Sequence, residues 1–402
     1  MQQRVERQVV IWGAGRIGRG FVADLFDRAG YRLTLIDQAP ELIAELRRAG
    51  RYTLVYAPGH DQPSRRVLTG FTALATAETS AVAAAVAQAD WLALAVFARD
   101  FPAVVRELQP GIQLRRTQRP QANLDILLCT NLSEAARAFE AQLHTIWPPD
   151  LLAYAAQHIG LVETLVMRMV TEPPPAERER EPLLVWTNGV TEFPVARCAF
   201  KGEIPQVPGL RLVDNMRAEE TRKLYTYNTF HATLAYHGAR LGYRLIVDCL
   251  ADPEVCRLAR GALQEASQAL QAEYGFGAAE MGDWVQQVVR QTDNPSLGDT
   301  VERFAADPRR KLQRHDRLLG PALLARKHGI SPRHLSSAIA AALLYHNPTD
   351  AGAQYVQEQI ARLGVTGALR EICQLDTSEE DLACAIAQAY DRLAGDRAAL
   401  MG

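Results

Sequence analysis

The sequence has no excess of charge of either sign and no long hydrophobic segment. Its 402 residues carry 44 lysines and arginines against 46 aspartates and glutamates, so the formal net charge is −2. Overall charge therefore does not favour binding to nucleic acid or to an anionic membrane. No apolar run approaches the roughly 20 residues that span a bilayer, and residues 1–10 lead into a strand and not into a signal peptide. We expect a folded cytoplasmic protein whose partner is a small molecule, with no nucleic acid and no membrane.

Motifs that hold metal ions are also missing. The six cysteines form no Cys-x-x-Cys pair, the nine histidines form no His-x-x-x-His pair, and neither an EF-hand loop nor a P-loop occurs. We predict no metal. We expect the cysteines to be buried apolar residues in a reducing compartment.

The first half of the chain alternates strand patterns with helical patterns. The runs QVVIWGAG, RLTLID, DWLALAVF and NLDILLCT are typical of buried parallel strands, and helical patterns fall at about residues 16–29 and 40–49. This order predicts an α/β domain with a Rossmann-type, doubly wound sheet. Two further β-rich runs, RYTLVYA and SRRVLTGF, are joined by Pro58, Gly59, His60 and Asp61. They predict a hairpin inserted in that sheet.

The second half reads as helix. Residues 172–182, EPPPAEREREP, are expected to form a solvated loop. Strand-like segments continue beyond this loop, so we place the domain boundary near residue 195. From about residue 214 onward, helical patterns are interrupted at Gly242, Pro253, Gly275, Pro295, Pro308, residues 329–332, Pro348 and Gly364. We predict a nucleotide-binding domain over residues 1–195 and an all-α domain over residues 196–402.

A dinucleotide fingerprint follows the first strand. Gly13, Gly15 and Gly18 form G-x-G-x-x-G between a strand and a helix, where the glycines permit a tight turn, approach of a pyrophosphate and close helix packing. Asp37 ends the second strand, where a carboxylate accepts hydrogen bonds from the adenine ribose and repels a 2′-phosphate. This favours NAD over NADP. The alternative is an ordinary strand-to-helix turn followed by an ordinary strand-end aspartate.

The cofactor residues that we assign are Gly13, Ala14, Gly15, Arg16, Ile17, Gly18, Asp37 and Val96. Arg16 could reach a phosphate or could equally point into solvent.

A long helix beginning near residue 218 carries a group suited to alcohol oxidation. At about 100° per residue, Asn228 and His231 lie about 140° and 80° around the helix from Lys223, on one broad face. An amine could accept the hydroxyl proton while an amide and an imidazole stabilise the oxyanion. Arg222 or the nicotinamide ring could lower the pKa of Lys223. The alternative is a solvated lysine beside a packed asparagine and histidine.

The order of motifs resembles a known family. VVIWGAGRIGRGF, FKGEIPQVPGLRLVDNM, RKLYTYNTFHATLAYHG, YGF and NPSLGDTVERFAADPRRKLQRHDRLLGPA together are similar to the polyol-specific long-chain dehydrogenases, the mannitol dehydrogenase family, over nearly the whole chain. The resemblance implies that Lys223 is the general base and that Asn228 and His231 form the oxyanion site. It further implies NAD-dependent, metal-independent hydride transfer between a secondary carbinol carbon and C4 of the nicotinamide.

The chain departs from the family pattern at four positions. Thr130 replaces the acid of a Cys-Glu-Asn or Cys-Asp-Asn run, which leaves Asn131 as a candidate for substrate contact. Met167 replaces an aspartate, and Phe97 and Phe230 stand where glycines are expected. These changes predict a smaller or less polar pocket and leave the particular substrate open.

Basic residues crowd a stretch of fifteen residues that contains Arg303, Arg309, Arg310, Lys311, Arg314 and Arg317. A solvated surface loop would explain them. The resemblance instead implies a sugar-phosphate site, for which we select Arg310 and Lys311.

The resulting hypothesis is an NAD-dependent oxidoreductase that interconverts a hexitol phosphate and a ketose phosphate, most simply mannitol 1-phosphate and fructose 6-phosphate. A reductase of a hexulosonate or of an unphosphorylated polyol or ketose is one alternative, and a non-catalytic NAD-binding sensor is the other. The sequence leaves open whether the protein is a monomer or a dimer, the direction of the reaction and its hydride stereospecificity.

Overall fold

The computed structural model describes residues 7–57 and 59–401, with side chains up to residue 395. The chain forms two compact units, Met1–Glu219 and Glu220–Gly402. The boundary that we expected near residue 195 thus differs from this division. Residues that follow 195 stay with the first unit because β11 (Phe193–Ala196) pairs in parallel with β12 (Leu210–Val213).

The first unit contains the predicted α/β fold. Its main sheet has six parallel strands in the order β5-β2-β1-β6-β7-β8. With the strands numbered along the chain this is the order 3-2-1-4-5-6 of dinucleotide-binding folds. The strands are β1 Gln8–Trp12, β2 Arg32–Asp37, β5 Thr72–Ala75, β6 Trp91–Leu94, β7 Leu124–Leu128 and β8 Ile159–Glu163.

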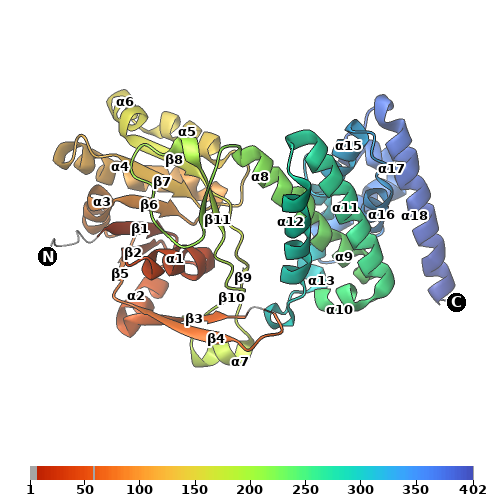
Figure 1. Ribbon diagram of the computed structural model, residues 1–402, viewed down its shortest axis with the longest axis horizontal. Helices are drawn as coiled ribbons and strands as arrows, with labels where there is room; N and C mark the ends of the chain where they lie inside the picture. Colours follow the sequence, from red (N-terminus) through yellow and green to blue (C-terminus); the bar gives the residue numbers. More distant parts are fainter. Residues whose placement is uncertain (1–6, 58, 402) are drawn as a thin grey trace. The chain divides into compact units, whose positions relative to one another are not determined.

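Both faces of this sheet are buried, which confirms the doubly wound architecture (Figure 1). Val9 and Ile11 of β1 pack on one side with the first helices, whereas Val10 and Trp12 pack on the other side with α3, α4, α5 and α6. The helices of this unit are η1 Gly18–Val22, α1 Ala23–Arg28, α2 Pro40–Ala49, α3 Thr79–Gln88, η2 Ala98–Asp100, α4 Phe101–Gln118, α5 Ala135–Ile146, α6 Pro149–His158, α7 Pro175–Arg180 and η3 Arg197–Ala199.

The predicted hairpin forms, but its predicted place in the main sheet is wrong. β3 (Arg51–Tyr56) and β4 (Ser64–Thr69) pair antiparallel within a separate sheet of order β4-β3-β10-β9. The other members of this sheet are β9 (Val170–Thr171) and β10 (Val185–Thr187). Of the four predicted turn residues, Pro58 lies outside the described residues.

The proline-rich segment 172–182 is exposed as expected, but it is not simply a loop. Residues Pro175–Arg180 form the short helix α7. Pro174 and Pro175 preset the backbone angle at its first turn, so proline at this place begins a helix and does not prevent one.

From Met216 onward, every secondary-structure element in the described residues is a helix, which confirms the predicted all-α domain. Prolines and glycines lie at the ends of these helices, as predicted. Pro253 opens α11 after the capping residue Asp252, and Gly275 closes it with φ of 74°. Gly364, with φ of 66° and ψ of 175°, interrupts the helical conformation within α17, as predicted. The helices that follow residue 240 are α10 Ile246–Ala251, α11 Pro253–Tyr274, α12 Ala278–Thr292, η5 Pro295–Leu297, α13 Val301–Ala305, α14 Pro308–Lys311, α15 Leu319–Lys327, α16 Arg333–Leu343, α17 Ala351–Cys373, η6 Thr377–Glu379 and α18 Glu380–Met401.

The central helix of the second unit contains a π turn. α8 (Met216–Lys223), the π-helical η4 (Leu224–Asn228) and α9 (Thr229–Arg240) follow one another without a break. α9 contacts α10, α11, α13 and α16 (Figure 1). The single helix predicted here exists, but its period is not uniformly 3.6 residues per turn.

The cysteines are only partly as expected. Cys129, Cys249 and Cys373 are buried, whereas Cys198 and Cys384 are exposed and Cys256 is half-buried. The prediction that all six are interior residues is therefore wrong. No helix in the described part of the chain combines the length and the hydrophobicity needed to cross a bilayer.

Candidate active site

The glycine loop after β1 has the geometry that a dinucleotide requires. Gly13 has φ of 96°, and a Cβ built on it would lie 2.4 Å from the Ala95 carbonyl oxygen. A Cβ on Gly18 would lie 1.8 Å from the carbonyl oxygen of Gly13. Around Gly15, in contrast, nothing lies within 4 Å of such a Cβ. The outer glycines therefore permit the turn and the packing, and the middle one leaves the loop open to a pyrophosphate.

Asp37 lies at the end of β2 and is bonded to the same loop. Its Oδ2 accepts a hydrogen bond of 2.7 Å from the Ala14 backbone N–H, and its Oδ1 accepts one of 2.9 Å from Ala39. A carboxylate has about four acceptor positions, so ribose hydroxyls could still donate to it. The structure thus places Asp37 beside the loop as the fingerprint requires.

A buried arginine that the sequence reasoning missed also holds this loop. Arg19 donates from Nε to the Ala14 carbonyl oxygen and from Nη1 to that of Leu183, both at 2.7 Å. The arginine that we did select, Arg16, is exposed and lies 3.6 Å from Glu172. No sequence signal separates the two arginines, because both lie in the same glycine-rich segment.

The loop and Asp37 border a cavity of about 170 Å³ within the first unit. Val96 lines it, and Ile17 packs half-buried against the core beneath the loop. The lining is mostly apolar and includes the carboxylates of Asp37, Asp100 and Glu107. It consists of Trp12, Gly13, Gly15, Asp37, Gln38, Thr76, Ala95, Val96, Phe97, Asp100, Ala103, Val104 and Glu107.

The residues that depart from the family pattern have different surroundings. Thr130 donates from Oγ1 to the Val96 carbonyl oxygen at 2.9 Å, and Asn131 beside it is exposed. Phe97 is 67% exposed and lines the cofactor cavity. Met167 and Phe230, however, are 4% and 0% exposed, so they are core residues. Of the four residues, Phe97 lines the cavity at the glycine loop, whereas Met167 and Phe230 pack in the interior.

In the second unit, Lys223 ends α8 and is half-buried. Its pKa is lowered to about 8, first by burial and then by the Arg317 guanidinium, with Glu220 acting in the opposite direction. A lysine with this pKa is partly neutral near pH 7 and can accept a proton.

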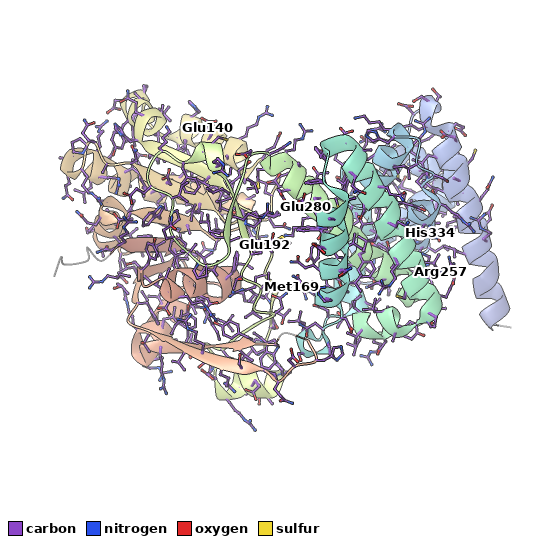
Figure 2. The ribbon with its side chains drawn as sticks, in the orientation of Figure 1. Glu140, Met169, Glu192, Arg257, Glu280 and His334 are labelled. Atoms are coloured by element: carbon purple, nitrogen blue, oxygen red, sulfur yellow. The ribbon has the colours of Figure 1, made fainter. Side chains whose placement is uncertain are left out.

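The cation that lowers the pKa of Lys223 is not the one that we predicted. Arg222 is buried and lies 2.5 Å from Glu280 of α12, which Figure 2 labels. Its guanidinium carbon lies 4.6 Å and 4.0 Å from the ring centroids of Phe276 and Trp284. These partners hold Arg222 as a structural residue, and Arg317 takes the predicted electrostatic role.

Asn228 lies at the end of the π turn, five residues after Lys223. Hydrogen bonds in a π-helix join residues five apart, so the π turn brings Asn228 closer to the face of Lys223 than the predicted 140°. The side chain is half-buried, and no hydrogen bond to its amide occurs within the described residues. The amide is therefore available to a substrate.

His231 is buried on α9 between specific partners. Its Nε2 lies 2.9 Å from the Thr292 hydroxyl, and its ring stacks on Phe304 with 4.5 Å between centroids. Burial, followed by Arg317, Arg303 and Lys223, lowers its pKa to about 3. The imidazole is consequently neutral at any pH at which the protein would work.

The basic stretch packs against this helix. Thr229 donates from Oγ1 to the Arg317 carbonyl oxygen at 2.6 Å, and Tyr236 donates from its hydroxyl to Ala305 at 2.8 Å. The Nε of Arg317 donates to Asp316. In the described part of the chain, neither Nη atom of Arg317 has a hydrogen-bond partner. Sequence reasoning named Arg317 among the basic residues but did not select it.

The two residues selected for phosphate binding have protein partners of their own. Arg310 forms ion pairs with Asp307 and Asp316. Lys311 is 3% exposed and donates from Nζ to the carbonyl oxygens of Phe304 and Ala306. Its pKa is lowered to about 7 by burial and by Arg317 and Arg310. Lys311 therefore lies in the interior and supports the backbone of the basic stretch.

Across residues 7–57 and 59–401, no group of three or more histidine, cysteine, aspartate or glutamate side chains is arranged to hold a metal ion. The candidate residues Lys223, Asn228 and His231 supply an amine, an amide and an imidazole.

Two family models and one relative of known name agree on the family of this chain. The Mannitol dehydrogenase Rossmann domain model matches residues 7–209, and the Mannitol dehydrogenase C-terminal domain model matches residues 215–394. Mannitol-1-phosphate 5-dehydrogenase of Brevibacillus brevis is 34% identical over 355 residues, which cover 88% of this chain and 90% of that protein.

Two solved structures share the fold. Pseudomonas fluorescens mannitol 2-dehydrogenase, in a ternary complex with NAD and D-mannitol, matches with a TM-score of 0.74 and 17% identity, over 98% of this chain and 93% of that one. A D-sorbitol dehydrogenase in substrate-free form matches with a TM-score of 0.82 and 14% identity, over 98% and 94%. The chain belongs to the mannitol dehydrogenase family of NAD-dependent oxidoreductases.

Proposed function

We propose that this enzyme interconverts a hexitol phosphate and a ketose phosphate, most simply mannitol 1-phosphate and fructose 6-phosphate. The relative from Brevibacillus brevis carries a name that states this type of substrate, and it shares 34% identity over 88% of the chain. The observation that carries the proposal is Lys223, whose pKa is lowered to about 8 on the helix that also bears Asn228 and His231.

In alcohol oxidation, the neutral Lys223 amine accepts the proton of the reacting hydroxyl group at Nζ. Burial and Arg317 favour the neutral form, and Lys223 returns the proton in the reverse direction. When bound at the Gly13 loop, NAD supplies the hydride acceptor. The Asn228 amide donates a hydrogen bond to the reacting oxygen, whose negative charge grows as the proton leaves.

For the phosphate group we now favour Arg317 over the two residues selected from sequence. Its Nη atoms offer the paired donors that a phosphate accepts, and the side chain is 16% exposed. Arg310 would have to exchange two carboxylates for the substrate, and Lys311 already donates to two carbonyl groups. Asn131 stays a candidate for contact with substrate hydroxyls because its side chain is exposed after β7.

The deciding experiment measures NADH oxidation with fructose 6-phosphate, fructose and a hexulosonate as substrates. We expect the highest kcat/KM for fructose 6-phosphate. A higher value for fructose or for the hexulosonate would replace the phosphate assignment with that substrate class. Binding of NADH without turnover of any substrate would favour the non-catalytic sensor.

A further inference from the structure

Two close contacts meet at one hydroxyl group on α12. Thr292 Oγ1 lies 2.9 Å from Nε2 of His231 and 2.8 Å from the Val288 carbonyl oxygen. Both are hydrogen-bond distances. A threonine hydroxyl has a single proton, so it can donate in only one of the two contacts.

The carbonyl of Val288 decides which contact receives that proton. A carbonyl oxygen only accepts, and a buried threonine in a helix commonly donates to the carbonyl four residues earlier. If the hydroxyl donated to His231 instead, two oxygen atoms 2.8 Å apart would face each other with no proton between them. The hydroxyl therefore donates to Val288 and accepts from the imidazole, which places the ring proton on Nε2.

The remaining ring nitrogen is then an acceptor. The His231 ring is neutral because burial and the nearby cations Arg317, Arg303 and Lys223 oppose a second proton. With Nε2 protonated, Nδ1 carries a lone pair and no hydrogen. In the described part of the chain, no protein group donates to Nδ1, so a substrate could.

We propose that Thr292 is a positioning residue that holds His231 in the Nε2–H form, so that Nδ1 accepts a hydrogen bond from a substrate hydroxyl next to the reacting carbon. This rests on the proposed function, because polyols and ketoses carry such a hydroxyl. The role differs from the oxyanion donor that the family resemblance implies for His231. Donation to the reacting oxygen then falls to Asn228.

The direct test is the protonation state of the ring. The enzyme is labelled with ¹⁵N in its histidine rings, and the His231 signal among the nine histidines is identified by its loss in His231→Gln. Two-dimensional spectra that correlate ring nitrogens with ring protons show which nitrogen carries the hydrogen. We expect Nε2–H in the free enzyme. An Nδ1–H form would overturn the proposal, whether or not the enzyme turns over a ketose phosphate.

Two variants and a matched control separate positioning from packing. Thr292→Val removes the hydroxyl and should give a mixture of the two ring forms, with kcat/KM about 2- to 10-fold lower, the worth of one hydrogen bond. Thr292→Ser should restore both properties. Thr233→Val is the control, since the buried Thr233 donates only to the Thr229 carbonyl in the described contacts. A histidine spectrum of Thr292→Val unchanged from wild type, or changed equally in the control, would contradict the proposal.

A substrate analogue tests the acceptor role. A ketose phosphate that lacks the hydroxyl bound by Nδ1 should lose about 2- to 10-fold in kcat/KM with the wild-type enzyme. The 1-deoxy and 3-deoxy analogues cover both neighbours of the carbonyl carbon. His231→Phe removes the acceptor, so that variant should not distinguish the deoxy analogue from the parent. An equal penalty in both enzymes would exclude a contact between His231 and that hydroxyl. If the spectra give Nε2–H while no ketose phosphate reacts, the ring assignment stands and the proposed substrate fails.

Discussion

The hydroxyl of Thr229 donates a hydrogen bond of 2.6 Å to the backbone carbonyl oxygen of Arg317. This bond joins the helix that carries Lys223 to the basic stretch that supplies a guanidinium. Because Arg317 is held there, its charge opposes protonation of both Lys223 and His231. In the proposed mechanism, the basic stretch therefore lowers the pKa values of Lys223 and His231 and also offers hydrogen-bond donors to the substrate phosphate.

Alcohol oxidation should depend on a single ionisation of Lys223. In the proposed mechanism the neutral amine is the base, and its pKa is about 8, so kcat/KM for the alcohol should rise tenfold per pH unit below pH 8 and level off above it. Lys223→Ala should lose about 10²- to 10⁴-fold in turnover while still binding NADH. Steady-state rates from pH 6 to 10 and fluorescence titration of NADH provide the measurements. A variant that keeps more than about a tenth of wild-type turnover would show that another group is the base.

Replacing Arg317 should change two measurements in a defined way. Arg317→Gln removes the cation beside Lys223, so the inflection of the pH profile should move to higher pH. The same variant should lose about 10- to 200-fold in kcat/KM for the phosphate ester, since charge-assisted bonds contribute about 1.5–3 kcal/mol. The kcat/KM for fructose should fall much less.

Arg310→Ala is the comparison variant for this prediction, because Arg310 was selected from the sequence and is paired with Asp307 and Asp316. If kcat/KM for the phosphate ester fell selectively in Arg310→Ala and not in Arg317→Gln, the phosphate site would be assigned to Arg310. An equal loss for both substrates in either variant would indicate a structural role for that arginine.

Asp37 should determine the choice of dinucleotide. Its carboxylate repels a 2′-phosphate and accepts from ribose hydroxyls, so NADH should be preferred to NADPH. Asp37→Ser should narrow this preference, mainly because it weakens the binding of NADH by about tenfold or more. Asp100→Ser changes a second aspartate that lines the same cavity and should leave the preference intact. Equal kcat/KM values for the two cofactors in the unaltered enzyme would refute the assignment.

A buried ion pair should dominate the stability of the first unit. Asp24 and Arg168 are 2.7 Å apart with both side chains fully buried, and Tyr56, Arg66 and Arg28 also donate to Asp24. Asp24→Asn leaves the Arg168 charge uncompensated, which costs about 3–5 kcal/mol in comparable cases. For a unit of this size the melting temperature should fall by about 6–20 °C. Calorimetry of the full chain measures it.

Asp27→Asn is the matched control for this stability prediction. Asp27 is bonded to Arg66 but only half-buried, and burial raises its pKa, so loss of its charge should cost much less. The pKa of Asp24 is lowered in the folded protein. Its contribution is therefore complete above the unfolded value of about 3.9 and is lost as the pH falls below it. Equal melting temperatures for the two variants would show that the pair adds nothing.

The α/β fold could be predicted because local signals agreed with the global architecture. Pro40 and Gly50 bound α2 at the predicted residues, and the apolar runs correspond to strands buried on both faces. The place of the hairpin could not be predicted. Its partner strand β10 comes more than a hundred residues later, and a local pattern does not specify a distant neighbour.

The sequence also suggested the candidate catalytic residues, but it did not indicate the roles of the cations around them. The types and spacing of Lys223, Asn228 and His231 suit proton transfer, whereas the cations around them are indistinguishable in sequence. Arg222 and Arg317 differ only through their partners in space, Glu280 and Asp316. Thr292 lies 61 residues from His231, and no motif connects the two.

The π turn at Leu224–Asn228 means that the spacing between Lys223 and Asn228 includes one residue more than an α-helix would need. A regular α-helix over the same residues would turn Asn228 and His231 by about 100° relative to Lys223, so that Asn228 would lie about 140° from Lys223 around the helix. The π turn removes this rotation, because five residues there span about the angle of four residues in an α-helix. The hydrogen-bond pattern of this segment is thus as important to the proposed catalytic arrangement as the identity of its residues, since the same side chains on a regular α-helix would lie farther apart.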